Sequence, residues 1–237
     1  MAKNILEIKN LTFSFHTYGG VVKSVRDVSF NVREGEILGI VGESGCGKSV
    51  TSQCILKHNP EPPGFFEGGS IKYKGEEIIT KTDREMRKIR GVEIGFIFQG
   101  FNLIPNLTAL ENVELPLIYR GLPRGERVRL SKMALERVGL GHRVTHKPAE
   151  MSGGQQQRVA IARAIAQAPP VILADEPTGN LDSHSTQEIM GILKELYKEG
   201  RTVILITHDN EIAAQAKRVI KIKDGKIESD SNTGRQL

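Results

Sequence analysis

The sequence has little cysteine and no long apolar run, and both shortages exclude classes of protein. Its 237 residues include 2 cysteines, Cys46 and Cys54, which have neither the spacing of a zinc site nor enough partners for a disulfide framework. Such usage is typical of a reducing compartment, so we expect a cytoplasmic chain. No segment reaches the about 18 apolar residues of a membrane span, and the N-terminal MAKNILEIKN lacks the apolar core of a signal peptide. A role at a membrane would therefore require a partner.

Repeats of solenoid length, low-complexity linkers and blocks of like charge are also missing. The 33 lysines and arginines are scattered among 28 acidic residues, with a net charge of +5. We therefore expect no nucleic-acid partner, although the basic excess suits a smaller anion such as a nucleotide or a membrane surface. The composition, 38% hydrophobic and 26% charged, is that of a globular domain. We expect the polar end of the chain, residues 231–237, to be frayed.

The hydrophobic pattern changes along the chain and predicts an α/β fold. Strands are expected at residues 5–15, 22–32 and 36–42, with a hairpin at 69–78. A helical stretch is expected at residues 108–121, kinked at Pro116, and at 124–140, stopped by Gly139. Short apolar strands at 171–175, 202–207 and 219–227 then alternate with helices at 184–200 and 210–216. This alternation is typical of parallel strands with crossover helices.

A glycine-rich loop follows the third strand. Residues 42–49 read GESGCGKS and match the phosphate-loop pattern G-x-x-x-x-G-K-[ST], between an apolar strand and a helix-compatible run. In such a loop successive N–H groups face a phosphate, Lys48 reaches the β and γ phosphates, and the Ser49 hydroxyl ligates Mg²⁺. The alternative is an ordinary glycine-rich turn, which the flanking strand and helix disfavour. The sequence therefore predicts a nucleotide site in a P-loop NTPase core.

An acidic pair ends a later apolar strand, VILADEP. Ligands of α/β sheets bind at the carboxyl ends of the strands. Asp175 would there hold Mg²⁺ through its water shell, and Glu176 would polarise an attacking water. The alternative is that the two acids end the strand because they meet solvent.

A second glycine-rich stretch, MSGGQQQRV at residues 151–159, opens the helical run AIARAIAQ. Ser152 can cap such a helix, but a glycine pair costs conformational entropy. The alternative is therefore an anion site at the helix N-terminus, with its anion bound elsewhere in the sequence.

These motifs, with Gln99 after GFIF, Asp182 in the LD pair and His208 after TVILIT, occur in the order of the ABC transporter ATPases. The sequence resembles this family over residues 5–230, and SGGQ separates the family from other P-loop ATPases. Met151 replaces the usual leucine before SGGQ, and Val50 replaces a common threonine. The resemblance implies one ATPase domain, with a catalytic core and antiparallel β subdomain at 1–98 and 165–230, a helical subdomain at 99–164 and a polar tail at 231–237.

The resemblance also implies ATP and Mg²⁺ as cofactors, hydrolysis to ADP and phosphate, and a role for each matching residue. The residues that it implies contact the nucleotide are Phe15, Gly42, Glu43, Ser44, Gly45, Cys46, Gly47, Lys48, Ser49, Val50, Ser152, Gly153, Gly154, Gln155 and Asp182. It implies that Ser49, Gln99 and Asp175 ligate the metal and that Glu176, His208 and Gln99 take part in catalysis.

Some of these roles have plain structural alternatives. Phe15 stacks on adenine in the family, but it also fits a half-buried strand. Asp182 either orients contacts across a dimer interface or caps the helix that follows. His208 either hydrogen-bonds the γ-phosphate or is a structural histidine. The loop at residues 100–107, GFNLIPNL, either presents apolar residues to a partner or packs into the core.

One phosphate loop, one SGGQ and one acidic pair imply a single nucleotide site per chain. The family pairs two such domains head to tail, so that the SGGQ of one faces the γ-phosphate held by the other. We therefore expect a homodimer, or a pair with a related ATPase, acting on a transmembrane permease on a separate chain. The ATPase would then lie in the cytoplasm, peripheral on the inner face of the cell membrane.

The subgroup of the family is indicated by two sets of motifs that disagree. FNLIPNLTALENVELPL and EPTGNLDS resemble the ATPases of lipoprotein release, macrolide export and cell division, whereas GESGCGKSVTS, EPP and EGGSIKYKGEEI resemble those of peptide importers. We favour the first set, because it lies at the catalytic and partner-facing regions. A soluble ABC ATPase of translation or DNA repair usually has tandem domains or a long coiled-coil insertion. Neither feature is found in this sequence, which disfavours that class. SGGQ argues against an unrelated P-loop kinase, and the lack of an N-K-x-D-like guanine reader argues against a GTPase.

Overall fold

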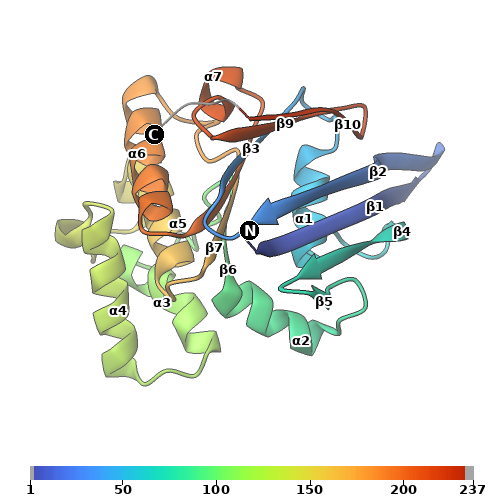
Figure 1. Ribbon diagram of the computed structural model, residues 1–237. Helices are drawn as coiled ribbons and strands as arrows, with labels where there is room; N and C mark the ends of the chain where they lie inside the picture. Colours follow the sequence, from blue (N-terminus) through green and yellow to red (C-terminus); the bar gives the residue numbers. More distant parts are fainter. Residues whose placement is uncertain (1–2, 233–237) are drawn as a thin grey trace. The chain divides into compact units, whose positions relative to one another are not determined.

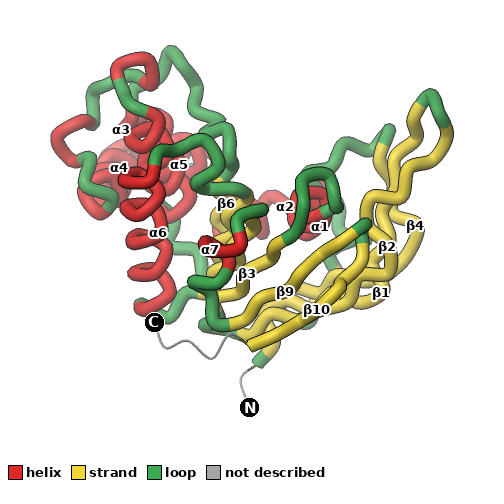
Figure 2. The backbone as a smooth tube through the Cα atoms, turned by 90° about the horizontal axis from the view of Figure 1, so that it is seen from above, coloured by secondary structure: helices red, strands yellow, loops and turns green. Residues whose placement is uncertain are grey.

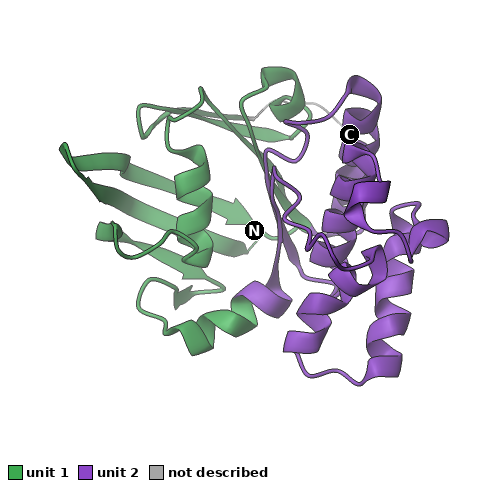
Figure 3. Ribbon diagram, turned by 180° about the vertical axis from the view of Figure 1, so that it is seen from behind, with its two compact units in different colours: residues 1–89, 202–237 green, residues 90–201 purple. Residues whose placement is uncertain are grey.

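The computed structural model describes residues 3–232 and divides the chain into two compact units (Figure 3). Unit 1 contains residues 1–89 and 202–237, and unit 2 contains residues 90–201. This division by compactness is not the division into subdomains expected from the sequence, and those subdomain boundaries stay a prediction. Among residues 3–232, none of the helices combines the length and the apolar character needed to cross a membrane.

Unit 1 contains an antiparallel sheet in the order β2-β1-β4-β5. Figure 2 shows β2, β1 and β4 as neighbouring yellow strands. The strands of this sheet are β1 (Asn4–Thr17), β2 (Gly20–Arg33), β4 (Gly64–Tyr73) and β5 (Glu76–Glu77). Leu11 and Phe13 alternate along β1 and are fully buried, as expected for a strand with one face on the core. The predicted hairpin at 69–78 is confirmed, because Lys72 pairs with Glu77 across its turn.

The other strands of unit 1 follow the order β10-β9-β3-β8. They are β3 (Ile37–Val41), β8 (Thr202–Thr207), β9 (Arg218–Lys223) and β10 (Lys226–Asn232). Every residue of β3 is buried between its parallel neighbours β8 and β9, the burial typical of a parallel sheet. The helices of this unit are α1 (Lys48–Leu56), α2 (Asp83–Lys88) and α7 (Asn210–Ala213).

The end of the chain differs from the expectation. The segment 219–227 is not one strand but two, since β10 returns antiparallel to β9 and Lys226 pairs with Lys223. The turn is made by Asp224 and Gly225, with φ of 50° and 77°, the dipeptide that favours tight hairpin turns. Because β10 continues to Asn232, the first two residues of the expected tail belong to a strand. The rest of that tail, 233–237, lies outside the described residues.

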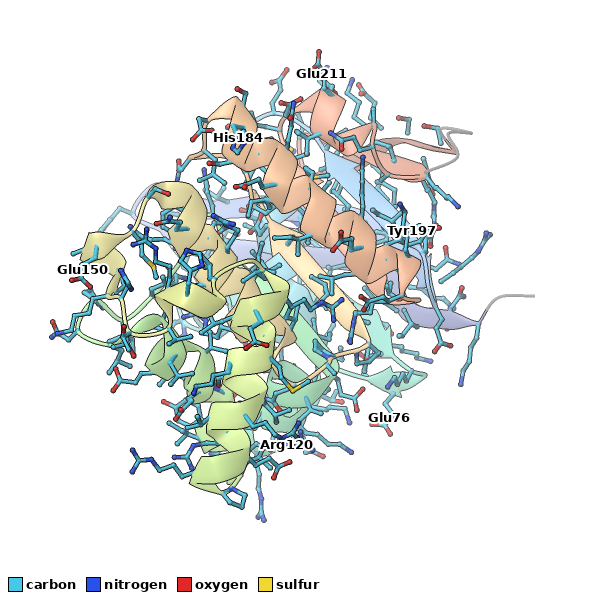
Figure 4. All side chains as sticks on the ribbon, turned by 90° about the vertical axis from the view of Figure 1, so that its left-hand side faces the viewer. Glu76, Arg120, Glu150, His184, Tyr197 and Glu211 are labelled. Atoms are coloured by element: carbon cyan, nitrogen blue, oxygen red, sulfur yellow. The ribbon has the colours of Figure 1, made fainter. Side chains whose placement is uncertain are left out.

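Unit 2 is mostly helical, as predicted for its middle stretch (Figure 1). Its helices are α3 (Ala109–Tyr119), α4 (Arg124–Arg137), α5 (Gly153–Ile165) and α6 (Ser183–Lys198), and its parallel strands are β6 (Ile94–Ile97) and β7 (Val171–Asp175). Pro116 lies inside α3, and Gly139, with φ of 74°, follows α4 as the predicted stop. The long helix α6 presents its side chains to the viewer in Figure 4, with His184 near its start and Tyr197 near its end.

Candidate functional site

The phosphate-loop sequence connects β3 to α1 in unit 1, as predicted. Gly47 is the N-cap of α1 with φ of 97°, and no side chain caps this helix. The first-turn N–H groups of α1 therefore have no cap oxygen of the kind that most helices use. Lys48 is 5% exposed, and its Nζ donates to the carbonyl oxygens of Gly42 and Glu43, each at 2.8 Å. The loop thus carries a cation and helix N–H groups together, the combination that binds phosphate.

Close contacts behind the loop explain two of its glycines. A Cβ on Gly42 would lie 2.1 Å from the carbonyl oxygen of Ile222 in β9, and a Cβ on Gly47 would lie 2.2 Å from that of Ser24 in β2. Gly225 also donates its N–H to the carbonyl of Cys46 at 3.0 Å. An ordinary surface turn would not need this backing, so the geometry favours the phosphate-loop interpretation over the glycine-turn alternative.

Three further predicted residues of unit 1 lie on α1, on β1 and directly after β8. Ser49 is half-buried in the first turn of α1, and its hydroxyl is a hard oxygen ligand of the kind that Mg²⁺ prefers. Phe15 is half-buried on β1 and meets Phe13 edge to face, with ring centroids 5.2 Å apart. The ring therefore satisfies the half-buried-strand alternative, and adenine stacking stays a prediction. His208 is exposed directly after β8.

The acidic pair ends β7 in unit 2, as predicted. Asp175 and Glu176 are only 7% and 8% exposed, so the alternative in which these acids simply meet solvent is disfavoured. Glu176 has φ of 49°, in the left-handed region, where the backbone of a residue other than glycine or asparagine is strained. Such strain concentrates at functional positions. Carboxylates at the carboxyl end of a parallel strand also fit the oxygen chemistry of Mg²⁺.

Gln99 lies against the loop that follows Glu176. A Cβ on Gly179 would be 2.8 Å from Gln99 Nε2, and Asn180 Nδ2 donates to the Gln99 carbonyl at 3.4 Å. Unit 2 therefore brings together the segment of the predicted metal ligand Gln99 and the segment of the predicted base Glu176, which the sequence separates widely.

The SGGQ stretch begins α5, and Ser152 caps it. Ser152 Oγ accepts from the N–H of Gln155 at 3.3 Å, and Gln155 Oε1 accepts from the N–H of Ser152 at 3.1 Å. The cap expected from the sequence is confirmed. Packing requires a glycine at only one of the two glycine positions. A Cβ on Gly154 would lie 2.4 Å from Ser185 Oγ of α6, whereas a Cβ on Gly153 would meet nothing closer than 3.6 Å. Packing explains Gly154 and leaves Gly153 open for the predicted anion contact.

Asp182 is the N-cap of α6. Its carboxylate accepts from the N–H of Ser185 at 2.8 Å and from the Ser185 hydroxyl at 3.0 Å. The backbone N–H and then the hydroxyl of Ser185 hold the pKa of Asp182 below its ordinary value. The capping alternative is confirmed, and the role of Asp182 at a dimer interface stays a prediction.

The loop at residues 100–107 is fixed by two polar residues that the sequence analysis missed. Fully buried Asn112 accepts from the N–H of Ile104 at 2.8 Å and donates to its carbonyl at 3.2 Å. Arg163, whose pKa burial lowers, donates to the carbonyls of Phe101 and Asn102 at 2.9 and 2.6 Å. Ile104 nevertheless remains 44% exposed, which supports the partner-surface interpretation. In the sequence, Arg163 could have been noticed as the single arginine in the otherwise apolar run AIARAIA.

A phosphate loop between a parallel strand and a helix, with an acidic pair after another parallel strand, defines a P-loop nucleotide-binding protein. The chain belongs to the ABC transporter family, whose model, described as ABC transporter, matches residues 25–179.

Relatives and solved structures agree with this assignment. The macrolide export ATP-binding/permease protein MacB of Aggregatibacter actinomycetemcomitans is 46% identical over 96% of this chain, which spans 35% of that relative. An uncharacterized ABC transporter ATP-binding protein of Thermotoga maritima is also 46% identical, over 98% of this chain and 97% of its own length. The macrolide-export likeness expected from the sequence is thus confirmed.

Among solved structures, the ATP-binding cassette MJ0796, a dimer in a post-hydrolysis state bound to ADP and Pi, has a TM-score of 0.88. It is 40% identical and covers 98% of this chain and 100% of its own. The structure of cbiO1 from Clostridium perfringens, part of the cbiONQ transporter complex, has a TM-score of 0.83 at 29% identity, over 97% of this chain and 89% of its own. The predicted α/β ATPase fold is confirmed.

Proposed function

We propose that this chain binds ATP at its phosphate loop and hydrolyses it to ADP and phosphate, as the ATP-binding cassette of a membrane transporter. The observation that carries the proposal is the loop between β3 and α1, where buried Lys48 and a helix start without a side-chain cap meet. The solved cassette MJ0796, bound to ADP and Pi, supports the same chemistry for this chain.

Each predicted residue receives a role in this proposal. Lys48 binds the terminal phosphates, and Glu176 accepts a proton from the attacking water while His208 steadies that water and the γ-phosphate. Ser49, Gln99 and Asp175 are the proposed Mg²⁺ ligands. Mg²⁺, when bound, neutralises charge on the phosphate oxygens. Phe15 is proposed to stack on the adenine.

We further propose that ATP closes a head-to-tail homodimer. The N-terminus of α5, where Gly153 is not required by close packing, would then face the γ-phosphate on the partner copy. That MJ0796 was solved as a dimer supports this arrangement.

The transport partner is also a proposal. MacB is named an ATP-binding/permease protein, and we propose that this cassette drives a transmembrane permease from the inner face of the cell membrane. The exposed side of the 100–107 loop, with Ile104, is the surface we assign to that contact. Co-purification with a permease would support it, and association with ribosomes instead would contradict it.

The substitution Glu176→Gln tests the hydrolytic proposal. It should keep ATP binding, because the phosphate loop is untouched, and slow turnover by about 10² to 10⁴, the usual contribution of a general base. The ATP-bound variant should accumulate as a dimer in size-exclusion chromatography. Glu195→Gln, at an exposed position of α6, is the matched control and should hydrolyse normally. Unchanged turnover in Glu176→Gln would refute the assignment, and a monomer with ATP bound would refute the dimer.

A further inference from the structure

One buried glutamine joins the two segments that carry Gln99 and Glu176. Gln157 lies on α5, shortly after SGGQ, and is 0% exposed. Its Nε2 donates to the carbonyl oxygen of Phe98 at 3.3 Å and to that of Pro177 at 2.7 Å. Phe98 directly precedes Gln99, and Pro177 directly follows Glu176. A single amide group therefore holds the chain next to both residues.

The two accepted hydrogen bonds fix the backbone of their neighbours. The Phe98 carbonyl belongs to the same planar peptide unit as the Gln99 nitrogen, so orienting this carbonyl orients the start of Gln99. The proline ring fixes φ of Pro177, which removes one of the two backbone torsions between its carbonyl and the carbonyl of Glu176. Glu176 itself is in a strained left-handed conformation, and such a conformation persists only where the surroundings hold it.

Stability alone does not explain why a glutamine stands at this position. Gln157 Oε1 is buried and has no hydrogen-bond partner among the described residues. A buried acceptor without a partner costs about as much free energy as two donated hydrogen bonds contribute. The amide therefore gains little for the fold as a whole, and its effect falls on where the two carbonyls lie.

We propose that Gln157 is a positioning residue for ATP hydrolysis, which sets the placement of Gln99 and Glu176 from the helix that begins with SGGQ. The proposal rests on the hydrolytic roles proposed above for those two residues. It assigns to α5 a task inside its own chain, in addition to the contact that SGGQ is proposed to make with a partner copy.

The chain offers a matched control in Gln167, just after α5. Gln167 Nε2 donates to the carbonyl of Pro116 in α3 at 3.1 Å, and its Oε1 also has no partner among the described residues. The two glutamines share their chemistry, one fully buried on α5 and one half-buried just after it, but differ in the segments that they hold.

The experiment compares Gln157→Met with Gln167→Met in the whole chain, with kcat, KM for ATP, ATP affinity and Tm measured for each. We expect Gln157→Met to lower kcat about 10- to 100-fold, the scale of a small misplacement of reacting groups, with KM and ATP affinity within about twofold of the unsubstituted chain. Gln167→Met should keep kcat within about twofold at a comparable change in Tm. Gln157→Glu, which points a carboxylate at both carbonyls, should lower kcat further, and Gln157→Met remains the deciding variant if that protein does not fold.

Unchanged kcat in Gln157→Met, or equal losses of kcat in the two methionine variants, would overturn the proposal. Glu176→Gln, measured alongside, separates this failure from a failure of the proposed function. Normal hydrolysis in Glu176→Gln would reject the function itself, whereas slow hydrolysis there with normal kcat in Gln157→Met would reject only the positioning role.

Discussion

Two helices of this chain start at glycine-rich turns, and their starts are completed in opposite ways. In unit 1, the N-cap of α1 is Gly47, which adopts a left-handed conformation and provides no cap oxygen. In unit 2, the N-cap of α5 is Ser152, which exchanges hydrogen bonds with Gln155 in a capping box. The first start has no side-chain cap for its N–H groups, whereas the second is largely capped by its own chain.

The glycines of the two starts differ in the same way. Gly42 and Gly47 are both fixed by backbone carbonyls that leave no room for a Cβ. At α5 only Gly154 is fixed by packing, and Gly153 has room for a side chain. A glycine-rich helix start is therefore not evidence of an anion site by itself. The evidence lies in a glycine that packing does not explain, which at α5 is Gly153.

Gly153→Asp tests the comparison with the largest expected effect. An aspartate in the first turn favours the helix dipole, so Tm should not fall. Hydrolysis should nevertheless drop by about 10² to 10³, the cost of losing one group that stabilises an oxyanion, while ATP binding to the monomer is retained. Gly153→Ala, which meets only ordinary contacts, is the control for the lost glycine. Normal hydrolysis in Gly153→Asp would leave Ser152 and its neighbours with a capping role alone.

Lys48→Ala tests the other start. Losing charge-assisted hydrogen bonds to phosphate should cost about 1.5–3 kcal/mol, or roughly 10- to 100-fold in the Kd for ATP. Lys57 is a matched control at the opposite end of α1, because its Nζ also donates to two backbone carbonyls, those of Ile79 and Lys81, each at 3.0 Å. Lys57→Ala should change Tm and leave the Kd within about twofold. Equal Kd values for all three proteins, measured by calorimetry, would remove the phosphate-loop assignment.

Gly225→Ala tests whether the β9–β10 turn supports the phosphate loop from behind. Its Cβ would lie 2.8 Å from the Ser24 carbonyl at a φ of 77°, so the turn and the Cys46 carbonyl bonded to it should shift. We expect a loss of about 1 kcal/mol in ATP affinity, roughly fivefold in Kd. Gly75→Ala, with φ of 85° and nothing within 4 Å, has the same backbone strain without the contact. Equal ATP affinities in the two variants would show that the turn does not influence the loop.

Local patterns predicted much of this molecule. The phosphate loop, the Ser152 cap, the acidic pair after β7 and the stop at Gly139 each depend on residues near one another in the sequence. The hairpin at the end of the chain was missed for a local reason, because the apolar run 219–227 was given more weight than the Asp224-Gly225 dipeptide inside it.

The polar contacts that support the candidate site could not be predicted from such patterns. Gln157 reaches Phe98 across 59 positions, and Arg163 reaches Asn102 across 61. In the sequence both residues are simply the polar members of a helical run. Which carbonyls they meet depends on how α5 packs against segments far away in the chain, and periodicity does not encode that packing.

The left-handed backbone at Glu176 sets stability against activity at a single position. Asparagine would adopt φ of 49° at lower cost than glutamate and without the extra unfolded-state freedom of glycine, so Glu176→Asn should make the folded chain more resistant to heat while removing the proposed base. A library of variants selected only for thermal resistance would thus drift away from hydrolysis at this residue. The same drift is useful to an experimenter, since it yields robust, inactive protein for capturing the nucleotide-bound form.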